Sequence, residues 1–317
     1  ELLLPAGDLD TAKRAIDHGA DAVYVGLDRF SARAKATNLS LAEMREAIAY
    51  AHARGAKIFC ALNILLFNDE LEDAIKAVAE LVGFGIDAFI VQDFGLATLL
   101  LSHFPETEVH ASTQMAVMNV CGAETIAALG FDRVVLARET SLEMMRAIRA
   151  ASSIDLEVFV QGALCVSYSG LCYMSSLAGD RSGNRGQCAQ PCRLPYGYGR
   201  FENRYPMSLK DNCLIRYLGE LARMGVASLK LEGRMKRPEY VAIVTGIYRA
   251  ALDGREVRSS DLSALRAAFS REGFTEGYYL GRTGPQMFGT RQPERPDREL
   301  LAAARATYEN LEPQRVP

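Results

Sequence analysis

The chain has 317 residues, a net charge of −3 and 49% hydrophobic residues, which is typical of a globular protein and excludes a disordered or fibrous chain. No apolar run is long enough to span a membrane, and the first residues lack the basic flank of a secretory signal, so we expect a cytoplasmic protein without a membrane partner. The absence of an initiator Met and the polar ending suggest that further sequence follows residue 317.

Short runs with strand propensity alternate with longer segments of helical periodicity along most of the chain. Eight runs are predicted to be strands, at residues 2–4, 22–26, 57–63, 88–92, 108–112, 133–137, 156–160 and 228–232. Segments such as 41–54, 70–83 and 141–151 are predicted to be intervening helices. Several helical segments end in a Gly just before the next strand, which is typical of a left-handed helix cap that leads into a parallel strand.

The predicted strands are nearly all apolar, as expected of strands that are buried on both faces. Eight consecutive β–α units therefore predict the α/β class and a TIM-like (β/α)8 barrel. A doubly wound open sheet is the alternative. No G-x-G-x-x-G motif follows the first strand, so nothing supports a dinucleotide site.

One link between strands is much longer than the others, and it defines the predicted domain organisation. About 65 residues separate the seventh strand from the eighth, where a β–α unit needs roughly 30. We therefore expect a barrel over residues 1–255 that includes a cysteine-rich insertion at 162–212. Residues 256–317 are predicted to be a C-terminal extension.

Polar residues follow several of the predicted strands, at the rim where a (β/α)8 barrel builds its active site. The candidates for proton transfer are His110, Glu139 and Glu232. The candidates for substrate binding are Asn63, Gln92, Gln114, Arg138, Gln161 and Arg234. The two arginines could hold a carboxylate or phosphate through paired hydrogen bonds, or could pair with Glu139 or Glu232 instead. Each polar residue could also be a simple cap or turn residue.

Five of the seven cysteines lie between residues 165 and 213, which suggests a set of metal ligands. The first four, Cys165, Cys172, Cys188 and Cys192, have the spacing C-x6-C-x15-C-x3-C. Structural zinc sites use closer C-x2-C pairs, so an iron–sulfur cluster is favoured over zinc and over unmetallated thiols. Cys213 could replace one of the four as a ligand.

The sequence around these cysteines resembles the collagenase-like peptidases, a family of U-type peptidases. Residues 157–175 carry the motif E-x-F-x-x-G-A-L-C-x4-G-x-C-x-M-S in full. The likeness continues over residues 179–193, 230–236 and 136–139, and it extends over roughly residues 1 to 285. The match is therefore far more specific than a single short motif.

The resemblance implies more than one activity. The family name implies proteolysis, whereas its better-understood members are proteins that hydroxylate a base of tRNA or rRNA, with prephenate as the implied hydroxyl donor. Relatives hydroxylate quinone precursors without oxygen as subunits of heteromers, and they carry a 4Fe-4S cluster. Carried over by position, Cys165, Cys172, Cys188 and Cys192 would be the cluster ligands. Gln161 stands where the family more often has His, which puts a proton-transfer role there in doubt.

The residues themselves favour hydroxylation over proteolysis. The chain has no H-E-x-x-H zinc-protease motif and no G-x-S-x-G nucleophile elbow. A cysteine protease would need a His beside one thiol of a group that looks like a metal site. We therefore interpret the chain as an iron–sulfur RNA hydroxylation protein, with a collagenase-like peptidase and a subunit of a quinone hydroxylation complex as alternatives.

Local charge is consistent with an RNA partner, although the net charge is negative. Arginines alternate with aromatic residues in the second half of the insertion, and cations with rings are what recognition of single-stranded RNA requires. The candidate RNA-binding residues are Arg181, Arg185, Arg193, Lys236 and Arg237. Alternatively, these arginines belong to a solvated loop that only screens the cluster.

Overall fold

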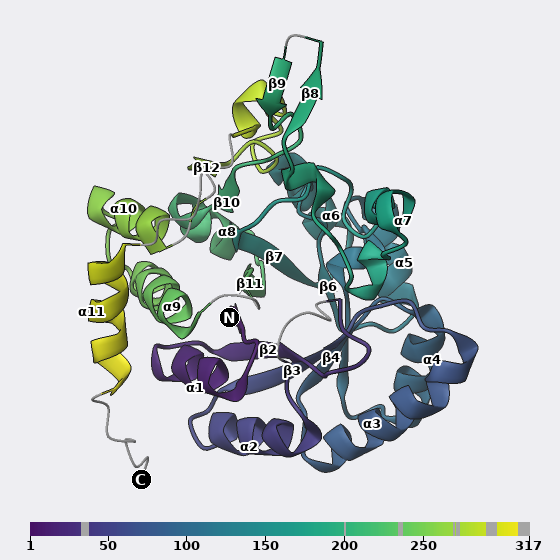
Figure 1. Ribbon diagram of the computed structural model, residues 1–317. Helices are drawn as coiled ribbons and strands as arrows, with labels where there is room; N and C mark the ends of the chain where they lie inside the picture. Colours follow the sequence, from purple (N-terminus) through teal and green to yellow (C-terminus); the bar gives the residue numbers. More distant parts are fainter. Residues whose placement is uncertain are drawn as a thin grey trace.

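The fold is a closed (β/α)8 barrel, as predicted (Figure 1). The computed structural model describes residues 1–32, 38–199, 201–233, 237–268, 270, 273–289 and 297–309. Within these residues, eight parallel strands form the barrel: β1 (Leu2–Pro5), β2 (Ala22–Gly26), β3 (Lys57–Leu62), β4 (Ala88–Val91), β5 (Glu108–Ala111), β6 (Arg133–Val135), β7 (Asp155–Gly162) and β11 (Ser228–Leu231). All eight predicted strands are confirmed, with ends that differ by at most two residues.

The sheet closes because β11 pairs with β1 on one side and with β7 on the other. The closure excludes the open doubly wound alternative. The pairing of β11 with β7 is irregular: Lys230 lies opposite Phe159, but the next residue, Leu231, lies opposite Gln161. Val160 is thus an extra residue on β7, which is a β-bulge, and such a bulge re-aims the side chains that follow it.

Helices cover the outer face of the barrel, and polar side chains fix where several of them begin. The helices of the β–α units are α1 (Leu9–Asp17), α2 (Leu41–His52), α3 (Leu71–Gly83), α4 (Phe94–His103), α5 (Val120–Ala128), α6 (Leu142–Ala151), α8 (Leu218–Arg223) and α9 (Pro238–Leu252). Asp8, Ser40 and Asp93 each accept a hydrogen bond from a backbone N–H in the first turn of α1, α2 and α4. These caps satisfy amides that have no partner within the helix.

Two sets of buried side chains hold the barrel together. The larger core lies between the strands and the helices and includes Val23, Ile58, Phe89 and Leu156. A smaller set, which includes Leu3, Tyr24, Phe59 and Ile90, comes from the alternate strand positions and fills the barrel interior. The interior is therefore packed rather than hollow, as is usual for this fold.

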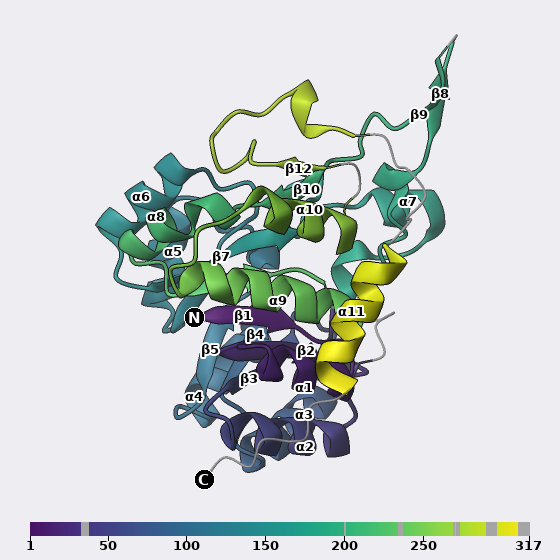
Figure 2. The same ribbon diagram turned by 90° about the vertical axis from the view of Figure 1, so that its left-hand side faces the viewer.

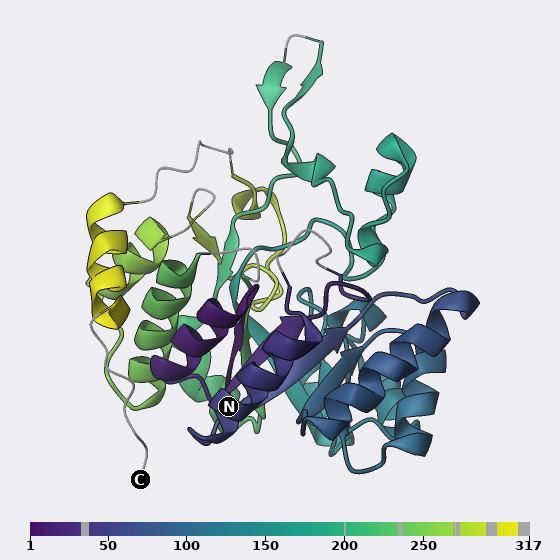
Figure 3. The same ribbon diagram turned by 60° about the horizontal axis from the view of Figure 1, so that its bottom comes forward.

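The long link after β7 forms the insertion that the sequence predicts. It contains α7 (Met174–Gly179) and a hairpin of β8 (Tyr196–Tyr198) and β9 (Phe201–Arg204), and it ends in β10 (Asp211–Cys213), which pairs antiparallel with the end of β7. Figures 2 and 3 show the hairpin projecting beyond the barrel and α7 beside its base. The insertion lies at the end of the barrel to which the strands point.

The C-terminal segment packs against the barrel instead of standing apart from it. Helices α10 (Ser259–Ala268) and α11 (Arg298–Glu309) pack on α9 (Figure 2). Strand β12 (Phe274–Thr275) adds a parallel neighbour to β10. Among the described helices, none combines the length and the hydropathy needed to cross a bilayer.

Candidate functional site

Three neutral amide side chains lie together at the carboxyl ends of β3, β4 and β5. The Nε2 of Gln114 donates to the backbone oxygen of Asn63 over 2.7 Å, and the Nε2 of Gln92 donates to the backbone oxygen of Gln114 over 3.3 Å. The Nδ2 of Asn63 lies 3.3 Å from Oγ of Ser112. The structure thus brings these three predicted substrate-binding residues together at the mouth of the barrel.

Arg138 and Glu232 form an ion pair on the opposite side of the mouth. The Nη2 of Arg138 lies 2.8 Å from Oε2 of Glu232, and the guanidinium stacks 4.0 Å from the centre of the Phe159 ring. Both side chains are 13% exposed. The sequence left two possibilities for Arg138, a ligand or a partner inside the rim. In the structure, Arg138 pairs with Glu232 inside the rim. Arg234 lies outside the described residues.

Glu139 holds the insertion rather than facing the mouth. Its carboxylate accepts hydrogen bonds from the backbone N–H of Ser169 at 2.7 Å and from the Ser169 hydroxyl at 2.9 Å. The backbone N–H of Arg138 also donates to the Ser169 hydroxyl. Ser169 is buried, so this contact fixes the chain between Cys165 and Cys172 over the sixth strand.

Gly170 makes the closest approach between the insertion and the rim. Its φ is +76°, and a Cβ built on it would lie 2.1 Å from the backbone oxygen of Gln114. Any residue with a side chain would push the insertion away from the end of β5, so only Gly fits. The loop of Ser169 and Gly170 therefore lies against the barrel mouth.

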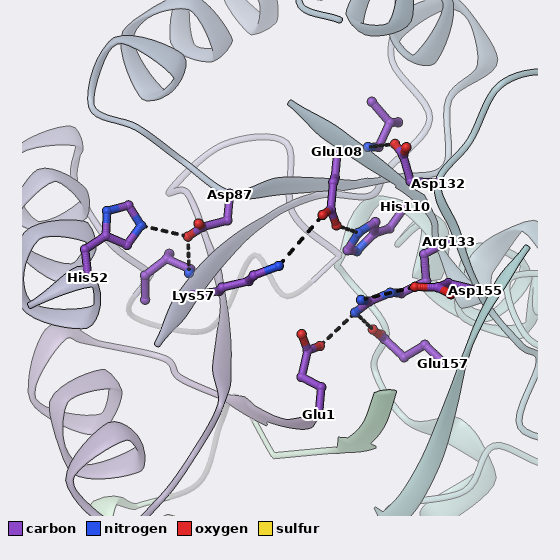
Figure 4. A network of polar contacts seen from close by, with 12 residues as sticks. Glu1, His52, Lys57, Asp87, Glu108, His110, Asp132, Arg133, Asp155 and Glu157 are labelled. Carbon is purple, nitrogen blue, oxygen red and sulfur yellow. Dashed lines mark hydrogen bonds and ion pairs between the residues drawn. The ribbon is translucent and has the colours of Figure 1, made fainter. Parts of the chain in front are cut away.

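His110 does not lie at the rim, which corrects the sequence prediction. Its side chain is fully buried, and its Nε2 lies 2.9 Å from Oε2 of Glu108 (Figure 4). Its ring meets that of Phe59 edge to face. Because β5 ends at Ala111, His110 lies inside the barrel, below the level of Asn63 and Gln114. Its other ring nitrogen, Nδ1, has no hydrogen-bond partner in the described part of the chain.

A network of buried charges surrounds Glu157 in the same half of the barrel interior (Figure 4). Lys230 Nζ lies 2.6 Å from one oxygen of Glu157, and Arg133 lies 3.4 Å from the other and 2.7 Å from Glu1. Burial acts to raise the pKa of Glu157, but the charges of Lys230, His110 and Arg133 hold that pKa below its ordinary value. The network is thus an ionised, paired cluster in the protein interior.

The acid stability of the protein should depend on Glu108. The hydrogen bond from His110 is the main reason that the pKa of Glu108 falls from 4.5 to about 2. Because the folded-state pKa is depressed, its contribution to stability is complete above pH 4.5 and is lost as the pH falls towards 2. We expect Glu108→Gln to flatten the decrease in unfolding free energy across that window, measured by urea unfolding beside the wild type. Equal slopes in the two proteins would contradict this.

Gln161 faces the outer helix layer, which is a second correction. Its Oε1 accepts a hydrogen bond from the hydroxyl of Tyr248 on α9 at 2.9 Å, and its side chain is 1% exposed. The bulge at Val160 explains this, because it interrupts the alternation that would otherwise point Gln161 into the mouth. A substrate-binding role for Gln161 has no support in this arrangement.

The four predicted ligand cysteines come close to one another in the insertion. Burial raises the pKa of Cys165, and negative charge on Cys172 and Cys188 raises it further. Burial also raises the pKa of Cys192, and charge on the other three acts in the same direction. A Cβ at Gly183 would lie 3.4 Å from the backbone oxygen of Cys172 and 3.8 Å from Cβ of Cys188, so these two segments meet there.

The spacing of this group differs from that of a single-ion site. In the described residues, no three Cys, His, Asp or Glu side chains are close enough together to hold one metal ion. The buried thiols need positive charge nearby to ionise. Arg138 is one source, because its charge lowers the pKa of Cys165. The four cysteines could hold a larger, multinuclear group.

Cys213 lies apart from the four. It is buried on β10 behind β7, and its Sγ contacts the hydroxyl of Tyr248 at 3.9 Å. The charges that act on its pKa come from Glu276 and Arg216, not from the other cysteines. The structure therefore gives no support to Cys213 as a replacement ligand.

The candidate RNA-binding cations differ in their surroundings. The prediction for Arg193 is wrong, because its side chain is only 4% exposed. It donates to Ser208 and to the backbone oxygens of Leu209 and Leu164, and so joins three segments of the insertion. Arg185 forms a two-point ion pair with Glu70 and stacks 4.4 Å from the Phe67 ring centre, which ties the insertion to the loop after β3.

The remaining three candidate cations are either at least partly exposed or outside the described residues. Arg181 is partly exposed after α7, and Arg237 is exposed at the start of α9. Lys236 lies outside the described residues. Of the five predicted cations, Arg181 and Arg237 therefore remain as described side chains on the surface.

Sequence reasoning did not find the residues that hold the insertion in place. Ser169 and Gly170 carry the contacts to Glu139 and Gln114, and Tyr248 fixes Gln161. Gly170 is part of the family motif, but the sequence does not show that it contacts Gln114. The pairing of Lys230 with Glu157 was also missed, although each of these charged residues lies within a mostly apolar strand.

The chain is similar to several known proteins. The model of the family described as "Peptidase family U32" matches residues 7–288. The 23S rRNA 5-hydroxycytidine C2501 synthase of Escherichia coli (strain K12) is 44% identical over an alignment of 289 residues that covers 89% of this chain and 43% of that protein. The tRNA hydroxylation protein P1 of Bacillus subtilis (strain 168) is 39% identical over an alignment of 268 residues that covers 80% of this chain and 63% of that protein.

A solved structure supports the fold alone. The U32 peptidase Mk0906 superposes with a TM-score of 0.50 at 16% identity, over 74% of this chain and 92% of that one. The chain spans about half the length of the two relatives described above.

Proposed function

The chain belongs to peptidase family U32, and from this premise we propose that it takes part in hydroxylating a base of tRNA or rRNA. One observation carries the proposal: Cys165 and Cys172 flank the segment of Ser169 and Gly170 that lies against the barrel mouth, and the charges of the four thiols act on one another. The names of two relatives, an rRNA hydroxycytidine synthase and a tRNA hydroxylation protein, support it. A reactive group on this loop would lie beside whatever binds in the mouth.

We further propose that Cys165, Cys172, Cys188 and Cys192 hold a 4Fe-4S cluster. Four cysteine thiolates are the usual ligands of such a cluster. Their spacing along the sequence lacks the close C-x2-C pairs of structural zinc sites. The cluster would supply one-electron chemistry beside the mouth. The protein half-buries Cys165, Cys172 and Cys192, leaves Cys188 exposed, and places the charge of Arg138 near Cys165.

Exposed apolar side chains support an RNA partner on the same face. Of the ten large hydrophobic side chains that are exposed in the described residues, eight lie on the insertion or on the loops after β3 and β4. They are Leu65, Phe67, Phe94, Tyr168, Leu171, Tyr173, Leu177 and Leu194. Exposed rings can stack on unpaired bases, and Arg181 and Arg237 would add positive charge for the phosphates.

A small carboxylate such as prephenate is the hydroxyl donor in this proposal, and Arg138 is the residue placed to bind it. Its Nε has no hydrogen-bond partner within the described residues, while its Nη2 is held by Glu232. We expect Arg138→Lys to keep the charge but to weaken prephenate binding by about 1.5 to 3 kcal/mol, measured by calorimetry. Arg146→Lys, which changes an exposed residue of α6, is the matched control. Equal affinity in the wild type and Arg138→Lys would remove Arg138 from the donor site.

The described histidines do not favour the peptidase alternative. His18 contacts Arg14 and Thr307, His52 contacts Asp87, His103 contacts Ser102, and His110 contacts Glu108. A cysteine peptidase needs a His that activates its thiol. In the part of the chain that the structure describes, none of these histidine contacts is to a cysteine.

Mass spectrometry of RNA nucleosides from a deletion strain tests the proposed function. We expect a hydroxylated nucleoside to disappear from total tRNA or rRNA, because the deletion removes the protein proposed to take part in this step. The strain with the gene restored should recover it. An unchanged nucleoside profile together with loss of a proteolytic activity would instead support the peptidase alternative.

A further inference from the structure

The mouth of the barrel has two chemically different halves. Asn63, Gln92 and Gln114 supply neutral amides at the ends of β3, β4 and β5. Arg138 and Glu232 supply an ion pair at the ends of β6 and β11. Guanidinium groups suit carboxylates, whereas Asn and Gln side chains suit the hydrogen-bonding edges of neutral bases. The two halves thus match two different ligands.

Gln92 is the least satisfied member of the amide half. Along β4, Ala88 and Ile90 point into the barrel and Phe89 and Val91 point outwards, so Gln92 follows on the inward side. It is only 7% exposed. Its Nε2 donates to the backbone oxygen of Gln114, so Oε1 is the end of the amide that this contact does not use. Among the described residues, Oε1 has no hydrogen-bond partner.

A buried acceptor without a partner lowers stability, so such a group in a mouth indicates a ligand that donates to it. The contact with Gln114 also fixes which end of the amide faces inwards, because a rotated side chain would set two oxygens against each other. The site therefore offers an acceptor and not a donor at this position. Its complement is an N–H or O–H group.

We propose that the amide half of the mouth reads the target base and that Gln92 is a specificity residue, which accepts a hydrogen bond from an exocyclic amino group. This inference rests on the proposed function. Cytosine has an amino group where uracil has a carbonyl oxygen, so the base edge itself carries the distinction. A base that leaves its stack to enter a pocket is commonly read through this edge. The site therefore selects cytosine over uracil.

Nucleotide titrations of the anaerobically purified full-length protein test the inference. We expect calorimetry to show that cytidine 5′-monophosphate binds about tenfold more tightly than uridine 5′-monophosphate. The amino group of cytosine donates a hydrogen bond to Gln92 Oε1, whereas uracil would set a carbonyl oxygen against it. Gln92→Leu should bring the two affinities together. The circular dichroism spectrum of Gln92→Leu should match that of the wild type, which guards against a result caused by misfolding. Gln286→Leu, which removes an exposed amide elsewhere, should change nothing.

Three results would overturn the inference. These are equal binding of the two nucleotides by the wild type, no detectable binding of either, or an unchanged preference in folded Gln92→Leu. Prephenate should be titrated as well, because its hydroxyl group could also donate to Gln92. Weaker prephenate binding in Gln92→Leu, without a change in nucleotide preference, would assign Oε1 to the carboxylate donor instead.

Failure of this inference is distinguishable from failure of the proposed function. Nucleotide preference is a binding measurement and does not require hydroxylation. An unchanged nucleoside profile in the deletion strain, with the cytidine preference intact, would refute the function and leave the role of Gln92 in binding. A lost hydroxylated nucleoside with equal nucleotide binding would refute the role of Gln92 alone.

Discussion

Replacing Cys165, Cys172, Cys188 or Cys192 by Ala should remove most of the iron from the anaerobically purified protein. The wild type should contain about four iron atoms per chain, because a 4Fe-4S cluster needs four thiolates and a missing one destabilises the whole group. Each thiol is a member of one group in the structure, so no single position should be dispensable. Iron and sulfide analysis, together with the absorption spectrum, measures the loss.

Two other cysteines are matched controls for this experiment. Cys121 is exposed on α5, and Cys213 is buried behind β7 against Tyr248. Their Ala variants should retain the iron of the wild type. Iron loss from Cys213→Ala alone would show that it replaces one of the four ligands. Stoichiometric zinc without iron after strictly anaerobic preparation would contradict the cluster itself.

Lys230→Met should destabilise the protein by about 3 to 5 kcal/mol, the usual cost of leaving one buried charge without its partner. Glu157 is fully buried, and Lys230 is its nearest cation at 2.6 Å. Arg133 lies farther from Glu157 and is shared with Glu1, so it offsets only part of the loss. Urea unfolding of the two proteins at neutral pH measures the difference.

The double variant Glu157→Gln/Lys230→Met separates the buried charge from a loss of packing. Removing both charges should restore much of the stability, because no ion then remains unpaired in the barrel interior. Double and single variants of equal stability would show that the Lys230 side chain acts through packing against Tyr24 and Phe159 instead. A single variant as stable as the wild type would contradict the role of the ion pair.

The barrel was predictable because its signals are local. Short apolar runs, several of them preceded by a helix that ends in Gly, predict the strands and their order, and the long link after the seventh strand predicts the insertion. Gly19, Gly85, Gly130 and Gly225 all have positive φ, as the pattern predicts. Closure then follows from eight such units in sequence.

The side-chain directions at the rim were not predictable to the same degree. The sequence predicts His110 at the rim because it lies near the end of a strand. Successive inward-facing positions of a strand lie at different heights in the barrel, and His110 lies below the rim. Gln161 turns outwards because of the bulge at Val160, for which the sequence gives no signal. The first error concerns the height of a residue along the barrel axis and the second the face of the strand, and neither concerns the choice of strand.

The surface charges of the insertion were hard to interpret for another reason. Arg193 and Arg185 look like exposed cations in the sequence, but a long arginine can cross the interior of a loop to reach backbone oxygens or a distant carboxylate. Glu139 and Ser169 meet beyond the end of β6 although 30 residues separate them. Contacts of this kind depend on the folded insertion, which has no regular pattern of its own.

The most direct test of the account is complementation of the deletion strain with the intact gene and with its Cys188→Ala variant, read out as hydroxylated nucleoside in purified tRNA and rRNA. We expect the intact gene to restore the modification and the variant, expressed to the same level, to leave it absent. Full restoration by the variant would contradict the central claim that the four cysteines of the insertion are required for RNA hydroxylation.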